Sequence, residues 1–248
     1  MNHGPLVFLG ALATFAASWT GLVLVPQFQM GGDLPAVQKA PSPDYPAARP
    51  GQAAQGLQVY RALGCAECHS QQVRPVAADL ERGWGRRRTV ARDFLQDSPV
   101  LIGRLRAGPD LANLGLREPG QYAAPWKYQS ASNHLDELRQ WHFVHLLNPR
   151  LLAPGSLMPA YPFLFEEKPL SPGAAPDPNA VKLPEKAAGL AAGRQYIPRL
   201  EARALVAYLL SLRADAPLFE APLPEPAPPT NAVAPANAPA AQVSANQP

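Results

Sequence analysis

The chain has 248 residues, of which 22 are Lys or Arg and 19 are Asp or Glu, and its formal net charge is +3. This charge is too small to indicate a nucleic-acid-binding protein, and the length favours one or two domains. The 31 prolines gather mainly in residues 35–50, 169–184 and 217 onward. Because proline removes backbone donors and breaks helices, we expect the packed core in residues 51–164 and 200–213 instead.

Near the N-terminus, residues 6–25 form an apolar run without a charged side chain. At about 1.5 Å rise per residue, a helix of this length spans roughly 30 Å, the thickness of the hydrocarbon core of a bilayer. We expect a transmembrane helix over 6–26 that ends at Pro26. A cleaved signal peptide with a cut near Ala16 and Ala17 is the alternative, but the apolar run continues well past these residues.

The Pro-rich residues 27–50 come next and are expected to form a semi-rigid spacer. They are followed by the stretch QAAQGLQVYRALGC, in which Leu57, Tyr60 and Leu63 share one helical face. We predict a helix here, with Gly56 one turn before Tyr60. This helix leads directly into the two cysteines of the chain.

Both cysteines belong to the sequence Cys-Ala-Glu-Cys-His, for which four interpretations compete. A zinc site needs four ligands, for which His142 and His145 would have to serve, and a thioredoxin-like pair needs a βαβ context that is missing. A disulfide between Cys65 and Cys68 would close a loop too short to stabilise much. C-x-x-C-H is also the signature of covalent haem c attachment, with both sulfurs in thioethers and His69 as the proximal iron ligand.

A second axial ligand favours the haem interpretation. Electron-transfer haems commonly use a Met thioether in this position, and the chain has Met1, Met30 and Met158. Met1 is the initiator and Met30 lies ahead of the motif, just outside the membrane. We therefore predict Met158, in a Pro-rich loop, as the ligand. His142 and His145 are the rival ligands, three residues apart on one face of a predicted helix.

A Gly-Pro turn provides a partner for the histidine. A haem-ligating histidine usually donates its other ring N–H to a carbonyl. Glycine permits close approach to the ring, and proline leaves its carbonyl oxygen free for this purpose. We predict that the carbonyl of Pro109, after Gly108, accepts the Nδ1 hydrogen of His69.

Arginines mark two further features. Arg74, five residues after His69, is a candidate for a contact to a haem propionate or to a partner protein. The basic stretch over residues 82–92 is expected to form a solvated face, with docking to a partner as the alternative. Its arginines are Arg82, Arg86, Arg87, Arg88 and Arg92.

A last helix closes the pattern. After a proline start, Leu205, Tyr208, Leu209 and Leu212 share one face, and we expect this helix to cross the first one at Gly56. The order of helix, CxxCH, Gly-Pro turn, Met loop and closing helix resembles the class I cytochrome c fold.

The expected fold is therefore mainly α, with a single transmembrane helix and a class I cytochrome c-like domain. The domain covers residues 51–213 and includes a Pro/Ala-rich insert at about 166–195. Residues 1–5 precede the membrane helix, and residues 214–248 form a Pro/Ala-rich tail that we expect to be disordered.

The motifs CHSQQVRP, HLLNPR and MPAYP, behind the N-terminal anchor, support a narrower resemblance. The chain resembles the mono-haem cytochrome c subunit, subunit II, of cbb3-type (C-family) haem-copper cytochrome c oxidases. The resemblance covers roughly residues 3–165 and, more weakly, 196–213. The insert and the tail depart from the family pattern.

This resemblance implies a non-catalytic electron-transfer subunit with one covalently bound haem c. Its partners would be a di-haem cytochrome c subunit or soluble cytochrome c as donor, and the catalytic haem-copper subunit that reduces dioxygen to water as acceptor. It would be anchored in the lipid bilayer of the bacterial inner membrane, and we expect no nucleic-acid partner in this location.

The side of the membrane also follows from the resemblance. Residues 1–26 contain no Lys or Arg, so the positive-inside rule gives no orientation. Haem c attachment occurs in the periplasm, which would place the haem domain there and residues 1–5 in the cytoplasm.

Three alternatives stay open. One is a free-standing membrane-anchored cytochrome c, another is the cytochrome subunit of a nitric oxide reductase, and the third is a haem-free zinc or thiol domain.

Overall fold

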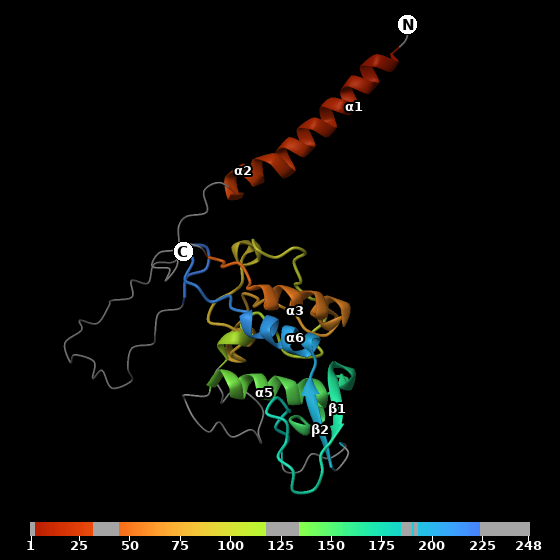
Figure 1. Cartoon of the computed structure of the whole chain (residues 1–248). Helices are drawn as coiled ribbons and strands as arrows, with labels where there is room; N and C mark the ends of the chain where they lie inside the picture. Colours follow the sequence, from red (N-terminus) through yellow and green to blue (C-terminus); the bar gives the residue numbers. More distant parts are fainter. Residues whose placement is uncertain (1–2, 32–44, 118–133, 185–189, 191–192, 224–248) are drawn as a thin grey trace, which may run out of the picture.

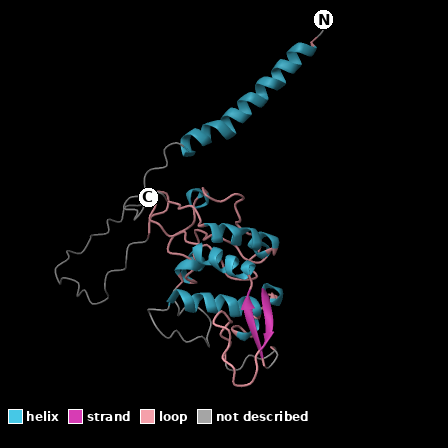
Figure 2. Cartoon of the chain, in the orientation of Figure 1, coloured by secondary structure: helices cyan, strands magenta, loops and turns pink. Residues whose placement is uncertain are grey.

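The computed structural model describes residues 3–31, 45–117, 134–184, 190 and 193–223 (Figure 1). Helices make up most of the regular structure, and the strands of the described part form one two-stranded sheet (Figure 2). The principal helices after the N-terminal one are α3 (Gly51–Ala62), α4 (Ala77–Glu81), α5 (His134–Leu147) and α6 (Leu200–Ser211). Short 3-10 helices cover Cys65–Glu67, Ala91–Phe94, Leu114–Leu116, Pro149–Leu151 and Pro162–Leu164.

One long apolar helix stands at the N-terminus. It consists of α1 (Gly4–Trp19), a π-helical turn (Thr20–Leu24) and α2 (Val25–Gly31). Its stretch Gly4–Gln29 has a mean hydropathy of 1.8 and is the one helix of the described chain long and apolar enough to cross a membrane. None of the side chains in this stretch is buried within the protein, which suits a helix that contacts lipid.

The helix continues past Pro26, where we expected it to end, and reaches Gly31. The N–H of Val25 donates to the carbonyl of Thr20, five residues back, so the turn just before the proline is wider than an α-helical turn. Such a turn gives the proline ring room and tolerates its missing N–H.

The helices α3 and α6 cross in close contact, and α6 lies between α3 and α5 in Figure 1. The crossing lies where the sequence predicts it. A Cβ atom on Gly56 would overlap the carbonyl oxygen of Ala204 and come within 2.7 Å of the Cβ of Tyr208. The rings of Tyr60 and Tyr208 pack beside this contact, with centroids 5.2 Å apart. Only glycine allows the two backbones to approach this closely.

A single main core joins α3, α5, α6 and the sheet. Val144 and Leu147 of α5 are almost fully buried, as are Leu205 and Val206 of α6. The helix α5 begins with acidic residues in its first turn, which suits the positive end of a helix. It ends before Pro149, which cannot continue the helix.

The Pro/Ala-rich insert carries more structure than its composition predicts. Strands β1 (Phe165–Pro169) and β2 (Arg194–Pro198) pair antiparallel at its two ends. Between them, Val181 is buried in the main core and its N–H donates to the carbonyl of Tyr196 at 2.8 Å. The expectation of little packing in 169–184 was wrong here, because alternate residues of β2 offer Val181 an apolar surface. Residues 185–189 and 191–192 lie outside the described chain.

The start of the C-terminal tail is also packed, against expectation. Leu218 and Ala221 are buried and form an isolated antiparallel bridge with each other. The prediction of disorder for 214–248 was therefore wrong for 214–223, because these apolar side chains find a surface on the domain. The rest of the tail, 224–248, and the spacer residues 32–44 lie outside the described residues.

The crossing of α3 and α6 gives a stability prediction. We expect Gly56→Ala to lower the free energy of unfolding by about 3 kcal/mol, because the added methyl group meets backbone that must move. Denaturant unfolding followed by circular dichroism measures the change. The matched variant is Gly51→Ala in the same helix, where a Cβ has nothing within 4 Å and we expect no loss. Equal stability of the two variants would contradict this account of the crossing.

Candidate functional site

The two cysteines lie on a tight turn directly after α3. Gly64 has a φ of 68°, a left-handed conformation that favours glycine and turns the chain into the 3-10 helix Cys65–Glu67. The N–H of His69 then donates to the carbonyl of Cys65 at 3.0 Å. Both cysteines are free thiols, with Cys65 half-buried and Cys68 exposed. One turn of chain therefore presents two sulfurs and one imidazole.

The chemistry of the thiols argues against two of the four interpretations. Burial raises the pKa of the Cys65 thiol to about 11, whereas redox-active pairs depend on a lowered pKa. No group of three or more His, Cys, Asp or Glu side chains in the described chain is arranged to hold a metal ion. A zinc site completed by His142 and His145 thus has no support in these residues.

The imidazole of His69 is held between two backbone groups of the Gly-Pro turn. Its Nδ1–H donates to the carbonyl oxygen of Pro109 at 2.9 Å. A Cβ on Gly108 would overlap the ring and lie 2.7 Å from Nδ1. Burial lowers the pKa of His69, which keeps the ring neutral near pH 7. With Nδ1 protonated, Nε2 carries the lone pair that can bind a metal ion.

A loop from Ile102 to Pro109 straps the cysteine turn. Gly108 N–H donates to the carbonyl of Cys68 and Gln71 N–H to that of Ile102, at 3.0 and 2.8 Å. Gly103, at a φ of 86°, approaches so closely that a Cβ would lie 2.7 Å from the Cα of Ser70. The role of Gly103 was not predicted, since a lone glycine in a loop carries no sequence signal beyond its backbone freedom.

The loop of Met158 packs against the main core, and its Tyr161 lies near the cysteines. Met158 is half-buried and packs against the main core, as Cys65 and Tyr161 do. Burial raises the pKa of Tyr161, and the nearby Cys65 and Cys68 raise it further. The Tyr161 N–H donates to the carbonyl of Leu146 at 2.8 Å, which fixes the loop on α5. Tyr161 of the motif MPAYP thus lies near the cysteine turn, and the ligand role of Met158 stays a prediction.

His142 and His145 are neutral and lie against Trp141 on α5. Burial lowers their pKa values to about 3 and 4, and His69 is near enough to lower that of His145 further. The ring of His145 stacks on Trp141 with centroids 4.8 Å apart. Its Nδ1 atom is buried and has no hydrogen-bond partner within the described residues. A bound prosthetic group beside His69 would complement this atom.

Arg74, the predicted propionate contact, is paired inside the protein. Its Nε and a terminal nitrogen donate to the carboxylate of Asp79 at 3.3 and 3.0 Å. Its side chain is about half exposed. The contact to a propionate stays a prediction.

The basic stretch is not a simple solvated face. Arg87 is almost fully buried and makes two hydrogen bonds of 2.7 and 2.9 Å to Asp93, which also accepts a hydrogen bond from Tyr45. Arg86 pairs with Asp215 at 3.0 Å. These contacts fasten the end of the spacer and the start of the tail to the domain, because Tyr45 and Asp215 lie in those segments.

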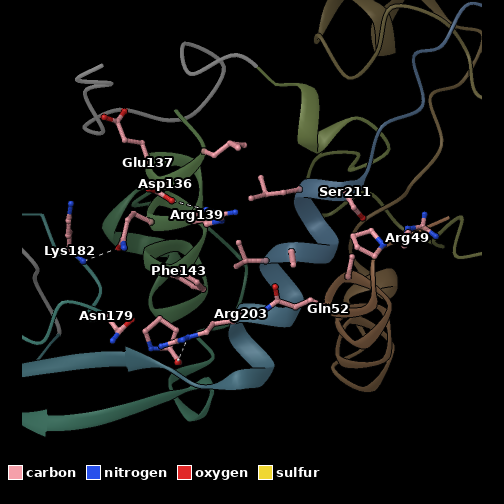
Figure 3. A pocket seen from close by; sticks show the side chains of 18 of the residues that line it. Arg49, Gln52, Asp136, Glu137, Arg139, Phe143, Asn179, Lys182, Arg203 and Ser211 are labelled. Carbon is pink, nitrogen blue, oxygen red and sulfur yellow. Dashed lines mark hydrogen bonds and ion pairs between the residues drawn. The ribbon is translucent and has the colours of Figure 1, made fainter. Parts of the chain in front are cut away.

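The hollow drawn in Figure 3 lies elsewhere. It has a volume of about 1880 Å³ and is lined by the N-terminal end of α3 together with parts of α5 and α6. Arg139 in its wall pairs with Asp136, and Arg203 donates to the carbonyl of Pro198. None of the predicted site residues lines it.

The buried pair of Arg87 and Asp93 gives a second stability prediction. We expect Asp93→Asn to cost about 3 kcal/mol, because it leaves a buried guanidinium without its counter-charge. The matched variant Asp215→Asn breaks the more exposed pair with Arg86 and should cost less than about 1 kcal/mol. Thermal and denaturant unfolding of both variants tests the difference, and losses of the same size would refute it.

Comparison with known protein families identifies the chain. The family model "Cytochrome C oxidase, mono-heme subunit/FixO" matches residues 5–137, which is more than half of the chain and includes the apolar helix, the cysteine turn and Pro109. The comparison with curated proteins gives no match. Membership in this family implies that the protein binds a haem, is associated with a membrane and has a catalytic oxidase subunit as its partner. This chain belongs to the FixO family of mono-haem cytochrome c oxidase subunits.

Proposed function

We propose that the chain is the membrane-anchored c-type cytochrome subunit of a cbb3-type terminal oxidase. It relays electrons from a cytochrome c donor to the catalytic haem-copper subunit, which reduces dioxygen to water. The observation that carries the proposal is the imidazole of His69, oriented by the Pro109 carbonyl beside two free thiols. This is the donor set that covalent haem c attachment requires.

The residues present fit this cofactor. Cys65 and Cys68 would hold the haem through thioethers, and His69 and Met158 would bind its iron. Because Gly108 has no side chain, there is room for the imidazole of His69. The buried Nδ1 of His145 has no hydrogen-bond partner within the described residues, and a bound group could supply one. A bound haem c supplies a one-electron couple between ferric and ferrous iron.

The protein's own part is to orient ligands and to exclude water. The hydrogen bond to Pro109 fixes the imidazole plane and makes the ring a better electron donor. A thioether ligand raises the reduction potential relative to histidine. Tyr161 and the core side chains around Cys65 keep solvent from this side of the site.

The crossing of α3 and α6, followed by the cysteine turn, the Gly-Pro turn and the Met loop, supports a class I cytochrome c-like domain over residues 51–213. The apolar helix supports a single-pass anchor in the bacterial inner membrane. Since haem c is attached in the periplasm, we place the domain on that side. A di-haem cytochrome c subunit or a soluble cytochrome c is the proposed donor.

Purification from native membranes tests the function. We expect the chain to keep its haem after denaturing electrophoresis and to copurify with a haem-copper subunit. A covalent haem without such a partner would favour a free-standing cytochrome, and a nitric oxide reductase subunit as partner would favour that enzyme. A mature chain without porphyrin on the peptide around Cys65 would rule out the proposal.

The axial ligand gives a spectroscopic prediction. Met158→Ala should abolish the weak far-red band of sulfur-ligated ferric haem and lower the midpoint potential by on the order of 100 mV, within the roughly 0.8 V that axial ligands control. The neighbouring Leu157 is 82% exposed, so Leu157→Ala serves as the control and should keep both properties. If Met158→Ala keeps its band while His145→Ala loses it, the ligand is assigned wrongly.

The Gly-Pro turn gives a further prediction. Gly108→Ala should push the imidazole of His69 off the Pro109 carbonyl, so that the yield of haem-loaded protein falls and its unfolding free energy drops by about 2 kcal/mol. Gly155→Ala is the control, since a Cβ there has nothing within 4 Å. Absorbance per polypeptide and denaturant unfolding measure both effects. Wild-type loading and stability in Gly108→Ala would contradict the packing argument.

A further inference from the structure

A buried polar network lies directly behind the hydrogen bond between His69 and Pro109. The residues that follow these two in the chain, Ser70 and Asp110, are bonded to each other, with 2.6 Å between Oγ and Oδ2. Asp110 is fully buried, and the same oxygen accepts the N–H of Gln72 at 2.7 Å. The segment that carries the histidine and the segment that carries its carbonyl partner are thus tied together one residue downstream.

Arg106 is the centre of this network. Its Nε donates to Ser70 Oγ at 2.8 Å and a terminal nitrogen donates to the carbonyl of Gln72 at 2.5 Å. The same terminal nitrogen lies 3.7 Å from the carboxylate of Asp110. The other terminal nitrogen donates to both oxygens of Asp79 at 2.8 Å. The planar fork of an arginine can serve these groups at once, whereas the ammonium of a lysine cannot.

The surroundings hold the guanidinium in place. Its carbon lies 5.0 Å from the centre of the Trp84 ring, and its side chain is 18% exposed. Burial opposes ionisation of Asp79, but hydrogen bonds from Arg74 and Arg106 hold the pKa of that carboxyl below its usual range. Two guanidiniums and two carboxylates therefore form a compact group behind the histidine.

The location of this network suggests a role beyond stability. A buried ion pair often contributes no more to stability than apolar residues of the same volume would. What such a network adds is a fixed geometry. Here it fixes the separation of the two segments that carry His69 and Pro109.

We propose that Arg106 is a positioning residue for the iron ligand His69. By bonding Ser70 and Gln72 on one segment, and by facing Asp110 on the other, it holds the Pro109 carbonyl in line with the Nδ1–H of His69. This inference rests on the proposed haem ligation by His69. Without the fork of Arg106, the direct bonds from Ser70 and Gln72 to Asp110 remain, but the two segments are held less rigidly and the hydrogen bond from His69 to Pro109 weakens.

The test uses the full-length, haem-loaded chain in detergent, in the ferrous state. Hydrogen exchange of the His69 Nδ1 proton is followed by NMR in Arg106→Lys and Arg106→Gln. We expect at least tenfold faster exchange in both, with less than a twofold change for the amide of Val206 in the core of α6. The midpoint potential of Arg106→Lys should rise, because a weaker hydrogen bond leaves the imidazole less electron-rich while the positive charge is kept.

Two further variants complete the experiment. Arg86→Lys alters an exposed ion pair and should leave the exchange rate and the potential as in the wild type. Ser70→Ala removes one link of the network and should accelerate exchange of the same proton less than the Arg106 variants do. It also tests the proposal if the Arg106 variants fail to fold.

The proposal is overturned if exchange and potential in Arg106→Lys equal those of the wild type. It is also overturned if the His69 proton and the Val206 amide accelerate equally, since that would report general destabilisation. Absence of covalent haem in the wild-type chain would instead disprove the proposed function, so the two failures are distinguishable.

Discussion

The organisation of this molecule depends on one close approach, in which the backbone of Gly108 and Pro109 lies against the imidazole of His69. The hydrogen bond selects the tautomer, and the missing side chain of the glycine leaves room for the ring. The two effects depend on each other, because an imidazole held further away could not donate its hydrogen bond to the Pro109 carbonyl. The strap of hydrogen bonds between this loop and the cysteine turn keeps the approach in place.

A few arginines of this protein pair with buried aspartates. Arg87 and Arg106 each satisfy an aspartate that is almost completely removed from water, and Arg74 adds donors to one of them. Buried carboxylates of this kind need full compensation, and the bidentate geometry of arginine supplies it. The formal net charge of +3 does not reveal these buried ion pairs, and composition alone could not distinguish them from a basic surface.

The elements that were predicted correctly from the sequence are those determined by residues close together in the chain. Gly56 and the helical face that carries Tyr60 predict a helix crossing, and the Gly-Pro dipeptide predicts a turn. Each prediction rests on local sterics and does not depend on distant residues. Patterns of this kind also located α5 and α6. The membership in the FixO family followed from short motifs, and the family match covers the cysteine turn.

The elements that were missed depend on partners far away in the chain. Val181 is buried because β2 lies beside it, and Asp93 is paired because Tyr45 and Arg87 meet there. Composition marks these stretches as proline-rich or basic and says nothing about contacts over such separations. Asp110, directly after the Gly-Pro turn, is likewise buried only because Ser70 and the backbone of Gln72 donate to it.

The contact of Tyr45 with Asp93 also limits how far the domain can travel. Because Tyr45 is fastened to the domain and the apolar helix runs to Gly31, the covalent path between them can stretch to at most about 50 Å. A domain tethered by so short a segment would stay close to the membrane surface. This would raise its effective concentration toward any partner embedded in the same membrane. In the proposed function, electron delivery would then depend on reorientation of the domain over a small distance rather than on diffusion through the compartment.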